Sequence, residues 1–144
     1  MPLNFSKNRI LILGAGVTGS ALAQSLTRRG AVIAIADDKK IENSPFETCL
    51  STDVDTTEWE SVIVSPGWKP GHPLVQRFIE AGIPVTNEID FAWQIKQEEA
   101  PNQRWFALTG TNGKTTTVEM AAAAMRAGGL HATACGNVGD TVIE

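Results

Sequence analysis

Residues 9–19 read RILILGAGVTG, a short apolar run that leads directly into a glycine-rich turn. From Val17 to Arg29 apolar residues recur with the helical period, and Gly30 can end a helix there in the left-handed conformation. A strand, a glycine turn and a helix in this order predict a β-loop-α unit, the context that a G-x-G-x-x-G match requires. The helix face expected to be buried consists of Val17, Ala21, Leu22, Ser25 and Leu26.

The glycines of this turn suit the binding of a phosphate. Gly14 permits the tight turn, Gly16 lets a phosphate approach the backbone, and Gly19 lets the helix pack closely on the strand. The helix N-terminus adds unpaired N–H donors and the positive end of a dipole. Asp37 follows the next predicted strand, Val32–Ala36, where its carboxylate can accept a hydrogen bond from a ribose or a base. Alternatively, the turn could serve only to pack the helix on the strand. The motif also does not distinguish a dinucleotide from a UDP-sugar as the ligand.

The residues that follow predict the rest of one parallel sheet and its helices. Residues 37–55 are polar, and we expect them to be irregular with one short helix or strand near residues 46–50. Further elements are expected at Ser61–Val64 (strand), Leu74–Ala81 (helix), Ile83–Thr86 (strand) and from the N-cap Asn87 to about Ile95 (helix). Their helices are expected to bury Leu74, Val75, Phe78, Ile79, Ile89 and Trp93. The predicted fold class is α/β, with a Rossmann-like parallel-sheet domain.

A polar stretch, residues 97–104, carries a proline and no periodicity, so it is the predicted linker. The expected domains are therefore residues 1–96 and, after the linker, residues 105–144. The second begins with a predicted strand at Trp105–Thr109, a glycine loop, a helix at Thr115–Ala127 and a strand at His131–Ala134. This is the first β-loop-α-β unit of a P-loop domain. One such unit buries too little surface to be stable alone, so we expect the chain to be the N-terminal part of a longer protein.

The glycine loop of the second domain reads TGTNGKTT at residues 109–116. Successive backbone N–H groups in such a loop surround phosphates, Lys114 reaches the β- and γ-phosphate oxygens, and the Thr115 hydroxyl can ligate Mg²⁺. The strict P-loop pattern has glycine at position 108, where this chain has Leu108. The loop nevertheless predicts an ATP or GTP site.

Other segments leave the choice between structure and function open. The loop Ser65-Pro66-Gly67 follows a predicted strand, where ligands of open sheets bind, but a plain turn fits equally. The loop at residues 136–139 contains Asn137, which can contact a ligand or simply favour a turn. The two histidines lack metal-ligand spacing and are expected to be structural, and the four tryptophans are expected in the core or at a domain interface.

The composition excludes several functional classes. The 144 residues carry a net charge of −4 and show no broad basic face, so no nucleic-acid partner is expected. No apolar run approaches the roughly 20 residues of a membrane span, and no signal peptide is recognisable, so we expect a cytoplasmic protein that binds no membrane. Cys49 and Cys135 lack metal-site spacing and are expected to be free, buried thiols.

The glycine turn at residues 14–19, the S-P-G loop and the TGTNGKTT loop together resemble the Mur ligases. The resemblance covers essentially the whole chain, and the TGTNGKTT element is highly specific for Mur and folylpolyglutamate ligases. Asn112 is similar to the glutamate-adding members, because the alanine-adding members usually carry histidine there.

This resemblance implies an ATP-dependent amide ligase of peptidoglycan synthesis, which adds D-glutamate to UDP-N-acetylmuramoyl-L-alanine with Mg²⁺ as cofactor. In such enzymes ATP phosphorylates the substrate carboxylate, and the amine of D-glutamate then attacks the acyl phosphate. The residues implied to bind the UDP-substrate are Gly14, Gly16, Val17, Thr18, Gly19, Asp37, Asp38, Ser65, Pro66, Gly67 and Asn137. Those implied to bind ATP are Gly110, Thr111, Asn112, Gly113, Lys114, Thr115 and Thr116, with Lys114 catalytic and Thr115 at the metal.

The resemblance also implies that further catalytic residues and a third domain lie beyond Glu144. We therefore expect the chain by itself to be a monomer that binds ligands weakly and catalyses nothing. Two alternatives remain at this stage: an NAD-binding module fused to an unrelated P-loop NTPase, and a complete, non-catalytic nucleotide sensor.

Overall fold

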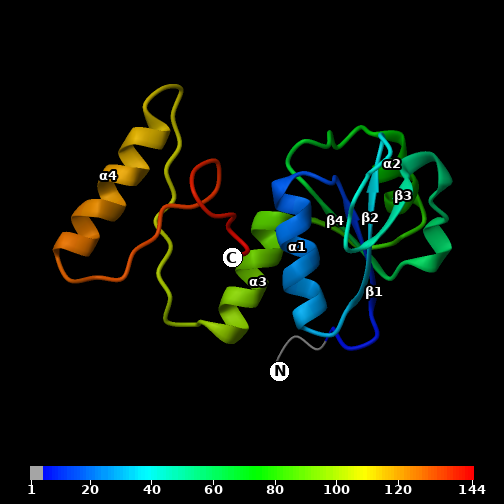
Figure 1. The fold of residues 1–144 in the computed structure, drawn as a ribbon, viewed down its shortest axis with the longest axis horizontal. Coiled ribbons are helices and arrows are strands. Elements are labelled where there is room, and N and C mark those ends of the chain that lie inside the picture. Colours follow the sequence, from blue (N-terminus) through cyan, green and yellow to red (C-terminus); the bar gives the residue numbers. More distant parts are fainter. Residues whose placement is uncertain (1–4) are drawn as a thin grey trace. The chain divides into compact units, whose positions relative to one another are not determined.

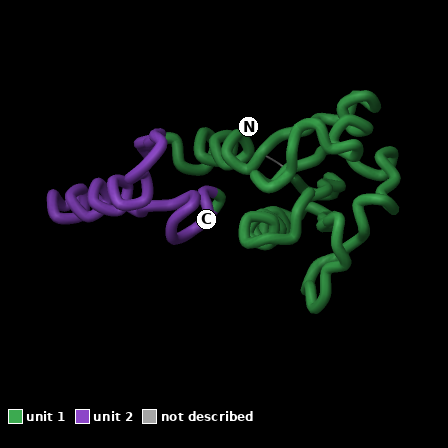
Figure 2. The backbone as a smooth tube through the Cα atoms, turned by 90° about the horizontal axis from the view of Figure 1, so that it is seen from above, with its two compact units in different colours: residues 1–101, 143 green, residues 102–142, 144 purple. Residues whose placement is uncertain are grey.

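The structure is a computed structural model that describes residues 5–144. The chain divides into two compact units, one up to Pro101 together with Ile143, and one from Asn102 to Val142 together with Glu144 (Figure 2). The first unit contains every β-strand ladder of the described residues, and the second contains one helix.

The first unit is built on a five-stranded sheet in the order β3-β2-β1-β4-β5, with every neighbouring pair parallel. Strands β1 to β4 are labelled in Figure 1. Its strands are β1 (Arg9–Leu13), β2 (Val32–Asp37), β3 (Glu47–Leu50), β4 (Ser61–Val64) and β5 (Val85–Asn87). The predicted α/β class with a Rossmann-like parallel sheet is confirmed. The short element expected near residues 46–50 is the edge strand β3.

Three α-helices accompany this sheet: α1 (Val17–Arg28), α2 (Pro73–Glu80) and α3 (Glu88–Glu99). Two short 3₁₀ turns, η1 (Ser51–Asp53) and η2 (Thr56–Glu58), lie between β3 and β4. Asn87 caps α3 as predicted, because its side chain accepts a hydrogen bond from the Asp90 N–H. The helix α3 runs to Glu99, four residues beyond the predicted end at Ile95, and so includes the beginning of the segment predicted as a linker.

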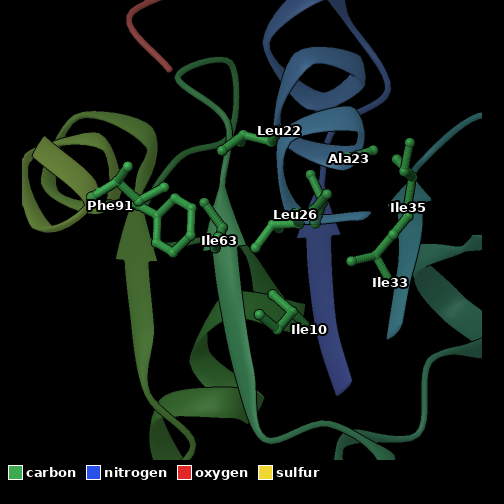
Figure 3. Packing of buried hydrophobic residues seen from close by; sticks show 10 residues of the cluster. Ile10, Leu22, Ala23, Leu26, Ile33, Ile35, Ile63 and Phe91 are labelled. Atoms are coloured by element: carbon green, nitrogen blue, oxygen red, sulfur yellow. The ribbon is translucent and has the colours of Figure 1, made fainter. Parts of the chain in front are cut away.

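The core consists of two apolar layers, one on each face of the sheet. Because side chains alternate along a strand, Ile10 and Ile12 face α1 and α3, while Leu11 and Leu13 face the opposite layer. Figure 3 shows the first layer, in which residues of α1 and Phe91 of α3 cover the isoleucines of the strands. Phe78 of α2 is fully buried in the second layer. Both faces of the sheet are thus covered, as in other parallel sheets.

The predicted buried faces of the helices are wrong at four positions. Val17 is 79% exposed in the first turn of α1, and Ile79 is 52% exposed beside the buried Phe78. Ile89 and Trp93 of α3 are also exposed, because Phe91 and Ile95 occupy the inward side. Side chains two positions apart on a helix point about 200° apart. Because Phe91 and Ile95 point into the core, Ile89 and Trp93 point outward.

The second unit contains α4 (Lys114–Ala127), whose least exposed side carries Val118, Ala121, Ala122 and Met125. The predicted strands Trp105–Thr109 and His131–Ala134 are wrong: among residues 102–144 the structure has only an isolated bridge between Cys135 and Asp140. A strand needs a neighbour that pairs with its N–H and C=O groups, and neither segment has one here.

Two further expectations concern the thiols and membrane spans. Cys49 is half-buried and Cys135 is exposed, so the expectation that both thiols are buried is wrong. Burial and the neighbouring acidic residues, Glu47 first, raise the pKa of the Cys49 thiol. Within residues 5–144 there is no helix long and apolar enough to span a bilayer.

Candidate functional site

The candidate site lies at the carboxyl edge of the sheet, where β1 and β4 are neighbours (Figure 1). From these two central strands the chain proceeds to β2 on one side and to β5 on the other, which makes this the topological switch point of the sheet. Ligands of open α/β sheets bind at such a point. The structure brings together here the glycine turn after β1, Asp37 and Asp38 at the end of β2, and Ser65 after β4.

A side chain would have a different effect at each of the three glycines in the turn at residues 14–19. A Cβ atom on Gly19 would lie 1.8 Å from the carbonyl oxygen of Gly14, so helix and turn could not approach as they do. Gly14 has a φ of +107°, and a Cβ there would lie 3.0 Å from the Cβ of Ser65. No atom lies within 4 Å of a Cβ built on Gly16. Only at Gly16 does the missing side chain leave open space, as a phosphate approaching the backbone requires.

The N-terminus of α1 faces this open space. Gly16 is the N-cap residue, and no side chain caps the first turn. The N–H groups of a helix's first turn lack partners within the helix and attract an anion together with the helix dipole. Val17 and Thr18, both predicted to contact the ligand, occupy this turn.

Asp37 holds the glycine turn against the end of β2. Its Oδ2 accepts a hydrogen bond from the Ala15 N–H at 2.9 Å, and its Oδ1 accepts one from the Lys39 N–H at 3.2 Å. Both carboxylate oxygens therefore bind backbone groups of the protein. Because each carboxylate oxygen has two lone pairs, Asp37 can support the turn and still accept the predicted contact with a ribose or a base.

Asp38 has a different environment, at the edge of a hollow of about 470 Å³. Its Oδ1 accepts a hydrogen bond from the Ser51 hydroxyl at 2.5 Å and lies 3.2 Å from Nε2 of His72. The side chain is 58% exposed, so part of the carboxylate is open to solvent. The hollow is lined by Asp38, Gly67, Trp68, Lys69, Gly71 and His72.

Ser65 has a buried hydroxyl without a hydrogen-bond partner in the described part of the chain. The residue is 8% exposed and lies against Gly14. An unsatisfied buried hydroxyl costs about 1–3 kcal/mol, so a polar ligand atom at this position would remove that cost. Pro66 and Gly67 are exposed, and Gly67 lines the hollow.

The hollow also contains residues that sequence reasoning did not assign to a site. Trp68 packs against the second core layer and His72 caps α2, in line with the predicted structural roles, but both also line the hollow together with Lys69. The Trp68 and His72 rings pack with their centroids 4.2 Å apart. Their position just after the carboxyl end of β4 is a signal that could have identified them, since that edge carries the ligands of such sheets.

The TGTNGKTT loop of the second unit leads into α4. Gly113 is the N-cap of α4 and has a φ of +73°, in the left-handed region that favours glycine. The Lys114 ammonium group donates to the carbonyl oxygens of Gly110 and Thr111. The remaining predicted ATP-binding residues, Asn112, Thr115 and Thr116, are exposed on this loop and the first turn of α4. The loop thus presents backbone donors and a lysine at a helix N-terminus, as phosphate binding requires.

Asn137 belongs to the second unit and is exposed in the loop closed by the bridge between Cys135 and Asp140. The Gly136 N–H donates to the Asp140 carbonyl oxygen at 2.9 Å, so hydrogen bonds within the loop define its shape. Among the described residues, no group of three or more His, Cys, Asp or Glu side chains is arranged to hold a metal ion.

Comparison with known proteins assigns the chain to a family. Residues 8–87 match the family described as Mur ligase MurD-like, N-terminal domain. The chain is 35% identical, over an alignment of 153 positions, to the UDP-N-acetylmuramoylalanine--D-glutamate ligase of Nocardia farcinica, covering 99% of this chain and 32% of that protein. It is 37% identical over 144 residues to the ligase of the same name from Mycobacterium tuberculosis H37Rv, covering 94% of this chain and 29% of that protein.

A solved structure supports the fold. The crystal structure of UDP-N-acetylmuramate-alanine ligase from Thermotoga maritima matches with a TM-score of 0.52 at 24% identity, over 82% of this chain and 29% of that one. The chain spans about a third of the length of the curated relatives it matches. The sequence match over the sheet domain shows that this chain belongs to the Mur ligase family, with a MurD-like N-terminal domain.

Proposed function

We propose that the protein is an ATP-dependent ligase that adds D-glutamate to UDP-N-acetylmuramoyl-L-alanine in peptidoglycan precursor synthesis. The observation that carries the proposal is the switch-point site, where an open glycine turn at a helix N-terminus adjoins an unsatisfied buried hydroxyl. The relatives named UDP-N-acetylmuramoylalanine--D-glutamate ligase supply the substrate class. This chain contributes the binding of the UDP part and the first elements of the ATP site.

The first unit would bind the UDP-substrate. The backbone N–H groups of the turn at residues 14–19 hold the pyrophosphate, with Thr18 beside it. The Ser65 hydroxyl and the open carboxylate oxygen of Asp38 bind the uridine, and Pro66 and Gly67 shape its surroundings. Asp37 supports the turn from the end of β2. In the second unit, Asn137 contacts the sugar-phosphate part of the substrate.

The second unit would bind ATP, which supplies the phosphoryl group that activates the substrate carboxylate. The N–H groups of residues 110–116 surround the phosphates, and Lys114 stabilises the negative charge that develops during transfer. The Thr115 hydroxyl would be the ligand for Mg²⁺ from this chain. These roles fit an exposed loop whose glycine at the N-cap of α4 adopts a left-handed conformation.

The bonding of Asp37 bears on whether NAD or a UDP-substrate binds the first unit. In dinucleotide-binding domains an acidic residue at the end of the second strand binds the ribose hydroxyls of NAD. Here both oxygens of Asp37 already accept backbone hydrogen bonds. A UDP-substrate that uses Asp38 and Ser65 leaves those hydrogen bonds intact.

Titration calorimetry of the 144-residue chain with UDP, and separately with NAD, tests the proposal. We expect measurable UDP binding and no NAD binding, because the site at the switch point offers partners for a uridine and a pyrophosphate. A Ser65→Ala variant should bind UDP more weakly, by about fivefold for one lost hydrogen bond. Saturation by NAD at micromolar concentration without UDP binding would contradict the proposal.

A further inference from the structure

His72 connects three separate parts of the candidate site. It is the N-cap of α2, its ring packs on Trp68, and its Nε2 lies 3.2 Å from Oδ1 of Asp38 at the end of β2. From this arrangement we infer that His72 is a positioning residue, which acts on the uridine through Asp38. The inference rests on the proposed binding of a UDP-substrate in the first unit.

The hydrogen bonds of His72 define which ring nitrogen carries the proton. Nδ1 accepts a hydrogen bond from the Leu74 N–H at 3.2 Å, so this nitrogen presents a lone pair. In a neutral ring with an unprotonated Nδ1 the proton is on Nε2, the nitrogen that lies 3.2 Å from Oδ1 of Asp38. The α2 N-terminus therefore selects the tautomer that can hold the carboxylate.

The ring itself is restrained on several sides. The Trp68 ring packs against it with a centroid distance of 4.2 Å and an interplanar angle of 54°. The backbone of α2 fixes Nδ1, and Asp38 fixes Nε2. His72 is thus a rigid link between the first turn of α2 and the carboxyl end of β2.

The consequence for Asp38 is that its two oxygens are no longer equivalent. Oδ1 has two partners, the Ser51 hydroxyl and His72, which together restrict rotation of the carboxylate. Oδ2 has no hydrogen-bond partner in the described part of the chain, and the residue lines the hollow. Oδ2 is therefore presented to a donor of the ligand. A uridine offers such donors in its imide N–H and its ribose hydroxyls.

Two substitutions separate this role from helix capping. In His72→Asn the amide oxygen can replace Nδ1 as the cap, because Asn is among the best N-cap residues, but the shorter side chain does not reach Asp38. In His72→Gln the amide nitrogen can take the place of Nε2 and donate to Asp38, while the cap is lost. One variant keeps the helix and the other keeps the contact with the carboxylate.

The experiment is UDP titration of the 144-residue chain and both variants, together with their thermal unfolding. We expect His72→Asn to keep the melting temperature of the wild type and to bind UDP about fivefold more weakly, as for one lost hydrogen bond. We expect His72→Gln to melt at a lower temperature and to bind UDP with nearly the wild-type affinity. In an Asp38→Asn background, adding His72→Asn should change UDP affinity much less, since the two residues act as one unit.

The outcomes distinguish this inference from the proposed function. Absence of UDP binding by the wild-type chain would contradict the proposed function and, with it, this role of His72. UDP binding by the wild type that is unchanged in His72→Asn would overturn the positioning role alone. Weaker UDP binding by His72→Gln, together with wild-type affinity in His72→Asn, would reduce His72 to a structural cap. The ¹⁵N chemical shifts of the His72 ring, measured without ligand, report independently whether Nε2 carries the proton.

Discussion

The chain contains two glycine turns that each open a helix, and they stand in different surroundings. The turn at residues 14–19 follows β1, the central strand of the sheet, and Gly14 and Gly19 are buried. The turn at residues 110–113 precedes α4 and is exposed, and the segment before it pairs with no strand. Both helices form where the sequence predicts them, but only the first turn is held by a sheet. Helix formation depends on local sequence, whereas strand formation depends on a partner that is distant in the chain.

The largest expected effect tests whether the two turns contribute to separate steps. In a ligase of the length of the curated relatives that contains this chain, the proposed function predicts that Lys114→Ala lowers turnover by a factor on the order of 10³, because it removes a charge that stabilises phosphoryl transfer. UDP-substrate affinity should hardly change, since Lys114 is not among the residues proposed to bind the UDP-substrate. Phosphate release at saturating substrates, together with titration of the UDP-substrate, measures both quantities. Near-normal turnover would remove the TGTNGKTT loop from the proposed phosphoryl site.

The next largest effect is on the free energy of unfolding and concerns how closely the turn at residues 14–19 packs in the first unit. Gly19→Ala should lower the free energy of unfolding of the first unit by about 3 kcal/mol, because its Cβ would overlap the Gly14 carbonyl oxygen. Urea denaturation followed by tryptophan fluorescence measures this change. Gly16→Ala is the matched control, since open space surrounds that position, and it should stay within about 1 kcal/mol of the wild type. Equal destabilisation by the two variants would contradict the assignment of Gly19 to close packing.

A ligand-binding effect without a stability effect is expected at Gly16. Gly16 has a φ of −69°, which any residue adopts, and a side chain there meets no protein atom within 4 Å. Gly16→Val should therefore fold normally but lose UDP affinity by at least about tenfold, because its methyl groups fill the proposed path of the phosphate. Calorimetric titration measures the loss, and the unfolding curve is the control. A folded Gly16→Val protein with unchanged affinity would exclude the turn from the site.

The smallest effect is a pH dependence that resides in the first unit alone. Arg29 at the end of α1 binds Glu99 of α3 through two hydrogen bonds of 2.7 Å. The hydrogen bond from Arg29 lowers the pKa of Glu99 below its usual value of 4.5. A lowered folded pKa means that the stabilisation is present above the unfolded pKa and is lost as pH falls through the folded pKa. Because the Glu99 side chain is 47% exposed, the contribution at neutral pH should remain under about 1 kcal/mol.

Unfolding of the wild type and Glu99→Gln at several pH values below 7 measures this contribution. The two stabilities should converge as the pH falls below about 4.5, the pKa of the carboxyl group in the unfolded chain. A stability difference that stays constant throughout the acid range would show that the ion pair has no pH-dependent role.

The sequence alone determined the elements whose signals are local. The apolar run after Arg9, the glycine turn and the helical period placed β1 and α1 to within a residue, and Asn87 placed the start of α3. The residues of the TGTNGKTT loop likewise predicted a glycine turn that leads into the helix α4. These features depend on neighbouring residues, through backbone conformation, capping and periodicity, so they can be read along the chain.

Only the tertiary structure decided features that depend on residues distant in the sequence. In the folded protein Phe91 is buried and Trp93 is exposed. The predicted strand at residues 105–109 pairs with no other strand of the described residues. The tertiary structure also placed Asp38 beside His72 and gave each carboxylate oxygen of Asp37 a backbone N–H donor, so the two adjacent carboxylates have different partners. Hydrogen-bond partners far apart in the chain meet only when the sheet assembles, so the sequence pattern carries no direct record of them.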